Sequence, residues 1–108
     1  MSRVILSEAA RQDRRAITEY TVDRFGIQQA RRLRDRFEAA LRALAESPLI
    51  GRGREELDPS GHTFRYLVVL KSFVIVYEPT EDGIRVARLL HGARNLAAEL
   101  KRDAGNED

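Results

Sequence analysis

Hydrophobic and polar positions follow two different periods along this chain, and the period changes near residue 63. In the first half, apolar residues recur every three or four positions, as they do on one face of a helix. In the second half, residues 64–70, 73–77 and 84–90 are rich in β-branched and aromatic side chains, which is typical of strands. The pattern therefore predicts helices first and a sheet afterwards.

The chain begins with a short strand that leads directly into a helix. Residues 3–6 form a mostly β-branched run, and Ser7 after it is a good helix N-cap. Glu8 then lies in the first turn, where the helix dipole favours a carboxylate. Apolar residues at helical spacing continue this helix to Phe25, and Gly26 ends it.

The second helix carries the clearest apolar stripe, and Pro48 ends it. The stripe consists of Ala30, Leu33, Phe37, Ala40, Leu41 and Leu44. Because only about two residues, Gly26 and Ile27, separate the two helices, we expect them to fold back as a hairpin.

Residues 49–62 contain three glycines and a proline, so a loop is predicted there. A tight turn at Lys71-Ser72 and a longer one at residues 79–83 should join the three later strands into an antiparallel sheet. The expected fold is α+β: a β-α-α-β-β-β order, with the helical hairpin on one face of a four-stranded, mostly antiparallel sheet. We expect one domain over residues 1–95, and a short segment at 96–108 with a helical turn and a tail.

The strands also predict a protein partner. Residues 64–70 and 73–77 are apolar at nearly every position, so both faces of the sheet should be covered. Two helices cover one face only. We therefore expect a second chain to cover the other face.

Composition narrows the function classes. A chain of 108 residues fits a single hydrophobic core, and the absence of cysteine excludes disulfides and thiolate chemistry. The histidines, His62 and His91, are far apart in sequence, so we expect neither a metal site nor a cofactor. No run approaches the ~18 apolar residues of a membrane span, and residues 1–3 lead into a strand rather than a signal peptide. A cytoplasmic protein is expected.

Charge gives a weak signal for nucleic acid. The pI is about 9.4, but the net charge is only +2 and the acidic residues are spread along the chain. Arginine outnumbers lysine 17 to 2, which we attribute first to genomic composition. Direct DNA binding by this chain alone is therefore not expected.

The order of several short motifs carries a family resemblance. The matching positions are Asp13, Ile17, Tyr20, Ala30, Pro48, Gly51-Arg52, Glu56-Leu57, Arg65, Tyr77 and Leu90-His91-Gly92-Ala93-Arg94. Over residues 3–95 the chain resembles the RelE/ParE family of toxins from bacterial toxin–antitoxin pairs, and the ParE branch more closely. One position departs from the family pattern: Arg14 stands where a leucine commonly follows the aspartate.

The resemblance implies two alternative activities. ParE-type members poison DNA gyrase by protein contact, without bond-breaking chemistry of their own, and His91 and Arg94 are the candidate contacts. RelE-type members cut messenger RNA on the ribosome. That chemistry would use Glu56 or Glu55 as base, Arg65 and Arg52 to hold the phosphate, and His91 as acid. The lysine-rich loop and terminal tyrosine of such nucleases have no counterpart here, so we favour gyrase.

The resemblance also implies a cognate antitoxin, whose disordered C-terminal part orders on the toxin as a helix in a groove and a strand at the sheet edge. The antitoxin-binding candidates are Tyr20, Leu41, Leu44 and Tyr66. A bare binding module that keeps only antitoxin binding is a third possibility.

The polar residues singled out above could also have purely structural roles. Arg65 could pair with Glu78 or Glu81, Tyr77 could be a cross-strand packing residue, and His91 could cap its strand.

Overall fold

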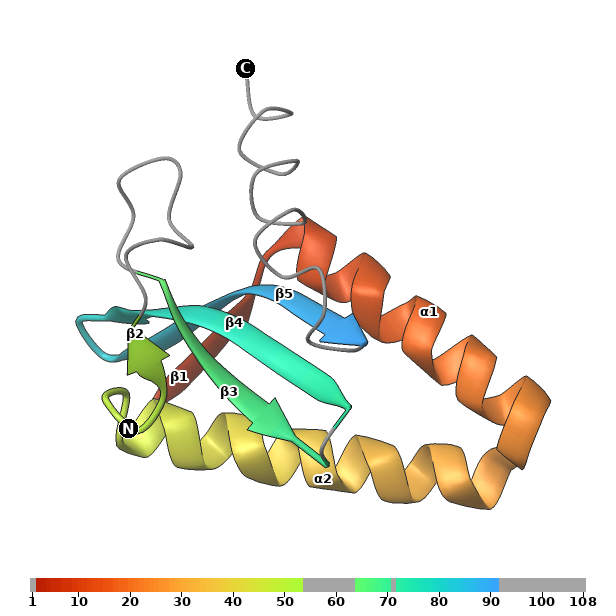
Figure 1. Ribbon diagram of the computed structural model, residues 1–108. Helices are drawn as coiled ribbons and strands as arrows, with labels where there is room; N and C mark the ends of the chain where they lie inside the picture. Colours follow the sequence, from red (N-terminus) through yellow and green to blue (C-terminus); the bar gives the residue numbers. More distant parts are fainter. Residues whose placement is uncertain (1, 54–63, 71, 92–108) are drawn as a thin grey trace.

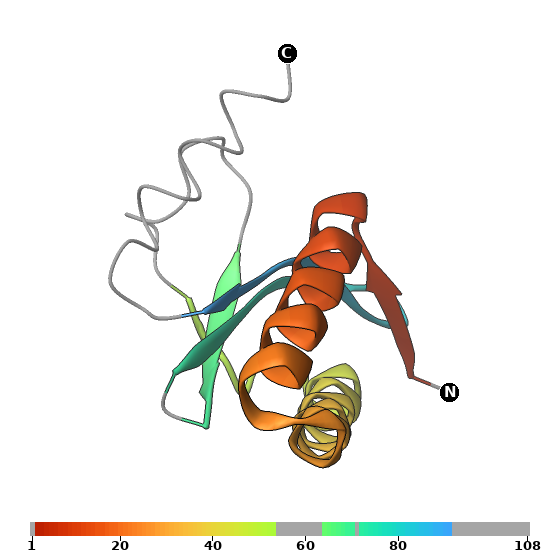
Figure 2. The same cartoon turned by 90° about the vertical axis from the view of Figure 1, so that its right-hand side faces the viewer.

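Two long helices pack on one side of a mixed sheet in the computed structural model, which describes residues 2–53, 64–70 and 72–91 (Figure 1). The elements are β1 (Arg3–Leu6), α1 (Glu8–Phe25), α2 (Ile27–Glu46), β2 (Arg52–Gly53), β3 (Arg65–Val69), β4 (Phe73–Thr80) and β5 (Gly83–His91). Figure 2 looks almost along α2 and shows both helices on the same side of β3 and β4. The expected α+β fold and element order are confirmed.

The sheet has one more strand than predicted. Its order is β1-β5-β4-β3-β2, and β1 pairs with β5 in parallel while the other pairs are antiparallel. The additional strand, β2, pairs Arg52 with Tyr66 and Gly53 with Arg65 inside the segment predicted as a loop. Two residues are too few to show a period in sequence, so only the pairing with β3 defines this strand.

Strand β4 also runs further than predicted, through Pro79 to Thr80. Its pairing with β3 ends where Arg65 meets Tyr77, whereas its pairing with β5 continues to Thr80. Proline lacks the N–H that a central strand donates. Pro79 is tolerated because it stands where β4 no longer has β3 beside it.

The start of α1 is tied to β5, as its N-cap shows. The Ser7 hydroxyl accepts a hydrogen bond from the Ala10 N–H at 3.0 Å and donates to the Ala87 carbonyl at 2.7 Å. The Ser7 N–H donates to the Val86 carbonyl at 2.9 Å. At the other end of α1, Gly26 has φ +88° and stands between the two helices, which explains the glycine. Both helix boundaries agree with the sequence.

The apolar stripe of α2 packs on the sheet. Phe37, Leu41 and Leu44 belong to a core cluster with Ile75 and Tyr77 of β4 and with residues of β5. Leu41 is 5% exposed and Leu44 is 0% exposed. The expectation that these two leucines contact an antitoxin has to be corrected, because their side chains face the sheet and offer no surface.

The opposite face of the sheet has a core cluster of its own. Val74, Val76 and Leu90 are buried there, with Tyr66 packed against them. The prediction that this face is left uncovered is therefore wrong for its centre. Val68, which pairs with Val74, is 48% exposed, so apolar surface remains on this face towards the end of β3.

Candidate functional site

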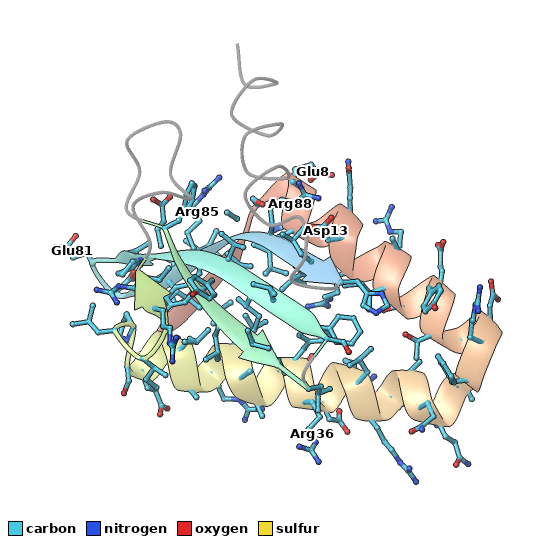
Figure 3. All side chains as sticks on the ribbon, viewed as in Figure 1. Glu8, Asp13, Arg36, Glu81, Arg85 and Arg88 are labelled. Atoms are coloured by element: carbon cyan, nitrogen blue, oxygen red, sulfur yellow. The ribbon has the colours of Figure 1, made fainter. Side chains whose placement is uncertain are left out.

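An open groove of about 750 Å³ lies where the hairpin end of the helices meets the ends of the last three strands. It combines exposed apolar and aromatic side chains with arginines. Its lining residues are Tyr20, Thr21, Phe25, Gln29, Arg32, Leu33, Asp35, Arg36, Leu70, Ser72, Phe73 and His91. Arg36 is labelled on α2 in Figure 3. The groove therefore brings His91, at the end of β5, into one site with both helices.

A row of rings holds His91 in this groove. Its imidazole stacks on Phe73 with ring centroids 4.6 Å apart and an interplanar angle of 15°. Phe73 in turn meets Phe37 edge-on at 5.3 Å, which anchors the row in the core. On the outer side, Tyr20 meets His91 edge-on at 5.6 Å, and the Arg24 guanidinium lies 5.1 Å from the centre of the Tyr20 ring. His91 is exposed yet held in a fixed orientation.

Several large apolar side chains at and beside this groove are exposed. Phe25 is 63% exposed, Ile27 58%, Leu70 43% and Tyr20 42%. Arg32 and Arg36 add positive charge at the same place, beside Asp35. Contiguous exposed apolar surface with a polar rim is typical of a protein-binding site.

An aspartate on α1 fixes the last residues of β5. The Asp13 carboxylate accepts hydrogen bonds from Arg88 Nε at 2.7 Å, Arg88 Nη2 at 2.9 Å and the Leu89 backbone N–H at 3.0 Å (Figure 3). Strand β1 covers the edge of β5 only as far as Val86, so the edge beyond it is open to α1. Asp13 satisfies the backbone there and positions the strand that ends at His91.

A second polar cluster lies at the other end of β4. The Tyr77 hydroxyl donates to the Pro48 carbonyl at 2.6 Å and accepts from the Gly51 N–H at 2.8 Å. Arg65 Nη1 donates to the Gly51 carbonyl at 2.8 Å. Burial raises the pKa of Tyr77, against smaller opposing effects of the Gly51 hydrogen bond and the Arg65 charge. The phenol is therefore neutral near pH 7.

This cluster fastens the segment after α2 to the sheet. A Cβ on Gly51 would clash with the Tyr77 hydroxyl, which explains why glycine stands there. Glu78 forms its ion pair with Arg85 at 3.4 Å, so the proposed pairing with Arg65 is not what the structure shows. Tyr77 packs in the core, as the structural alternative expected, but its hydroxyl is bound inside the protein.

Two of the residues named for RNA cleavage, Arg65 and His91, do not lie together. Arg65 pairs across the sheet with Tyr77, and His91 pairs with Phe73, four residues away along β4. Four residues of a β-strand span roughly 13 Å along the strand. Glu56 and Arg94 lie outside the described residues.

Other candidates are distributed over both faces. Tyr20 lies in the groove beside His91, whereas Tyr66 packs on the opposite face of the sheet. Sequence reasoning missed Phe73 and Phe25, because only the β4–β5 register and the hairpin place them in this groove. No group of metal-binding residues and no helix fit to cross a membrane occurs in the described part of the chain.

Comparisons with known proteins agree on one family. Residues 4–96 match the family model described as ParE toxin of type II toxin-antitoxin system, parDE. The chain is 35% identical over 100 residues to Toxin ParE1 of Mycobacterium tuberculosis, covering 92% of this chain and 98% of that protein. It is 28% identical over 100 residues to Toxin ParE3 of Caulobacter vibrioides, covering 93% and 96% respectively.

A solved structure shares the fold. The structure described as the chromosomal ParDE TA system from P. aeruginosa matches with a TM-score of 0.69 and 19% identity. The match covers 85% of this chain and 97% of the other.

Proposed function

Because this chain belongs to the ParE toxin family of type II toxin–antitoxin systems, we propose that it inhibits DNA gyrase and is neutralised by a cognate antitoxin. The proposed site of action is the groove around His91, where apolar surface, arginines and a rigidly held imidazole meet. Gyrase and its DNA are in the cytoplasm, so the toxin would act there. No cofactor is part of the proposal.

We favour gyrase inhibition over messenger RNA cleavage because Arg65 and His91 lie apart. A nuclease needs its phosphate-binding cation and its general acid around one scissile bond, within hydrogen-bond reach of it. Arg65 instead donates to the Gly51 carbonyl, and His91 lies at the other end of β4. This arrangement supports inhibition by protein contact.

His91 is the proposed gyrase contact within the described residues. Arg94, which lies outside them, is proposed as a second contact. Stacking on Phe73 fixes the imidazole before any partner binds, so little side-chain entropy remains to be lost on binding. A rigid, exposed ring of this kind resembles the anchors that dominate interface energies.

Tyr20 is the proposed antitoxin contact in the groove, together with exposed Phe25. Since the Tyr20 ring touches His91, an antitoxin segment over Tyr20 would also cover the imidazole. Neutralisation would then follow from occlusion of the gyrase-binding surface.

Purified chain tests the proposal in a supercoiling reaction that contains gyrase and no ribosomes. We expect loss of supercoiling with accumulation of cleaved DNA, and at least a roughly tenfold weaker effect for His91→Ala, as for an interface anchor. Glu38→Ala, at an exposed position of α2 outside the groove, is the control and should behave like the unchanged chain.

The alternative activities give different results. Codon-phased cleavage of ribosome-bound message that is lost in His91→Ala, with no effect on gyrase, would establish the RelE-type activity instead. Antitoxin binding without either activity would leave only a binding module.

A further inference from the structure

Leu70, in the short turn that joins β3 to β4 (Figure 1), has an unusual backbone conformation. Its φ is +55°, and it is the one non-glycine residue with a positive φ among the residues that the structure describes. In this left-handed region the Cβ of an L-residue crowds the following carbonyl oxygen, which glycine avoids. Leucine is strained there, so local backbone preference does not explain it.

Burial does not explain this leucine either. The Leu70 side chain is 43% exposed and lines the groove around His91. It belongs to neither core cluster of the described residues. Strained residues of this kind concentrate at binding and active sites, where the side chain is needed for something other than the fold.

The left-handed backbone decides which way Leu70 points. Side chains alternate between the two faces of a strand. Leu67 and Val69 of β3 pack on the helix side, whereas Tyr66 packs on the other face. A regular continuation of β3 would therefore turn Leu70 away from the helices. It lines the groove together with Leu33 of α2 instead, so the strained φ directs the side chain into the groove.

Leu70 and His91 lie at the same end of the sheet. His91 of β5 pairs with Phe73 of β4, and Phe73 pairs with Val69 of β3, the residue before Leu70. Neighbouring strands are ~4.8 Å apart, so roughly 10 Å separate β5 from β3 at this end. Leu70 and His91 are therefore two separate points on the strand side of one groove.

We propose that Leu70 is a further contact for gyrase, an apolar anchor that enters a hydrophobic pocket of that enzyme next to the contact made by His91. The inference rests on the proposed function and adds a residue that determines which target is recognised. Leu70 and His91 come from the strand side, whereas Tyr20 and Phe25, the proposed antitoxin contacts, come from α1. Two anchors at a set separation select a partner more strictly than one.

Glycine and alanine at position 70 test the strained backbone. Both substitutions remove the leucine side chain, but only glycine also removes the Cβ that the left-handed backbone crowds. Leu70→Gly should therefore melt about 2–6 °C above Leu70→Ala. At Leu49, which is 70% exposed and has no positive φ, the order should be reversed, because glycine loses more conformational freedom on folding.

Inhibition of gyrase should follow the side chain rather than the stability. In the supercoiling reaction without ribosomes, Leu70→Ala and Leu70→Gly should both need about tenfold more protein for half-inhibition, as for an interface anchor. Leu70→Met keeps an apolar side chain of similar volume and should stay within about threefold. Leu49→Ala, outside the groove, is the control and should inhibit like the unchanged chain.

The double variant His91→Ala/Leu70→Ala separates a direct contact from an effect through His91. Independent contacts at this separation add in free energy, so the two losses should multiply to about 100-fold. If Leu70 only supported the rings of Phe73 and His91, the double variant would inhibit no more weakly than His91→Ala alone. That result would refute the proposed contact.

Other results would also overturn the proposal. Leu70→Gly melting below Leu70→Ala would remove the strained backbone on which it is based. Full inhibition by both Leu70 variants, with His91→Ala impaired, would refute the contact and leave the proposed function intact, whereas no inhibition by the unchanged chain would refute both. If Leu70→Ala lost stabilisation by the cognate antitoxin and kept full inhibition of gyrase, the residue would be an antitoxin contact instead.

Discussion

At the scale of single residues, one hydrogen-bonded cluster explains two of the polar side chains that the sequence analysis singled out, Tyr77 and Arg65. Tyr77 and Arg65 both bind the backbone of residues 48–51, so neither is free for chemistry at a substrate. His91 makes ring contacts instead and remains exposed. The residue that faces outward is therefore the one that can recognise a partner.

The buried hydroxyl of Tyr77 predicts a pH dependence of stability. Burial raises the pKa of Tyr77 in the folded chain above its ordinary value near 10. Between the two pKa values the unfolded chain has lost the phenolic proton and the folded chain has kept it. This contribution to the free energy of unfolding is therefore full below about pH 10 and falls as the pH rises further.

Tyr77→Phe tests that dependence in urea unfolding across pH 8–11. Near neutral pH the variant should lose about 1–3 kcal/mol, because the Gly51 N–H and the Pro48 carbonyl lose their partner. Above about pH 10 the difference between the two proteins should shrink. Tyr20→Phe, at an exposed position, is the control. A constant difference at all pH values would contradict the assignment.

At the scale of elements, α1 acts as a cover for the open edge of β5. Ser7 binds the β5 carbonyl of Ala87, and Asp13 binds Arg88 and the Leu89 N–H one to two turns later. Asp13 and Arg88 each leave 16% of the side chain exposed, so the ion pair is largely removed from water. The contact replaces the strand pairing that β1 no longer provides there.

Asp13→Ala should therefore destabilise the chain far more than an ordinary surface change. The loss leaves a poorly solvated guanidinium and an unpaired backbone N–H, for which about 3 kcal/mol is expected. Asp23→Ala, at an exposed position of the same helix, should stay within about 0.5 kcal/mol. Equal midpoints for the two variants in urea unfolding would show that α1 does not depend on this contact.

At the scale of the whole molecule, apolar side chains are exposed at the hairpin end, whereas the centre of the second face of the sheet is buried. Phe25 is 63% exposed beside the groove, while Val74 and Val76 on the second face are buried. A partner at the hairpin end would therefore cover the exposed side chains of Phe25 and Tyr20. We therefore still expect a protein partner, but at the hairpin end rather than on the second face of the sheet.

A bound antitoxin should raise the melting temperature of the chain, because it binds the folded form. At a free concentration 100 times Kd the gain is about 2.7 kcal/mol. Phe25→Ser should reduce the gain in melting temperature and leave the isolated chain nearly unchanged. The matched control is Leu49→Ser, at a 70% exposed position outside the groove. A full gain with Phe25→Ser would place the antitoxin elsewhere.

The sequence by itself determined the order of the helices and of every strand except β2, because hydrophobic period, caps and turns are local. Ser7, Gly26 and Pro48 marked the helix boundaries, and the stripe of α2 identified its core face. The resemblance that singled out Tyr20 and His91 also came from sequence, although it gave them different partners.

Only the tertiary structure decided how these residues meet. The β4–β5 register stacks His91 on Phe73, and the helical hairpin brings the Tyr20 ring against His91. Arg65 pairs with Tyr77, four residues along β4 from the Phe73 that pairs with His91. The tertiary structure also showed that Leu41 and Leu44 belong to the core and that β1 pairs on one side only among the described residues. Long-range pairing sets these contacts, and a local pattern of apolar and polar residues contains no information on which strand edges remain open.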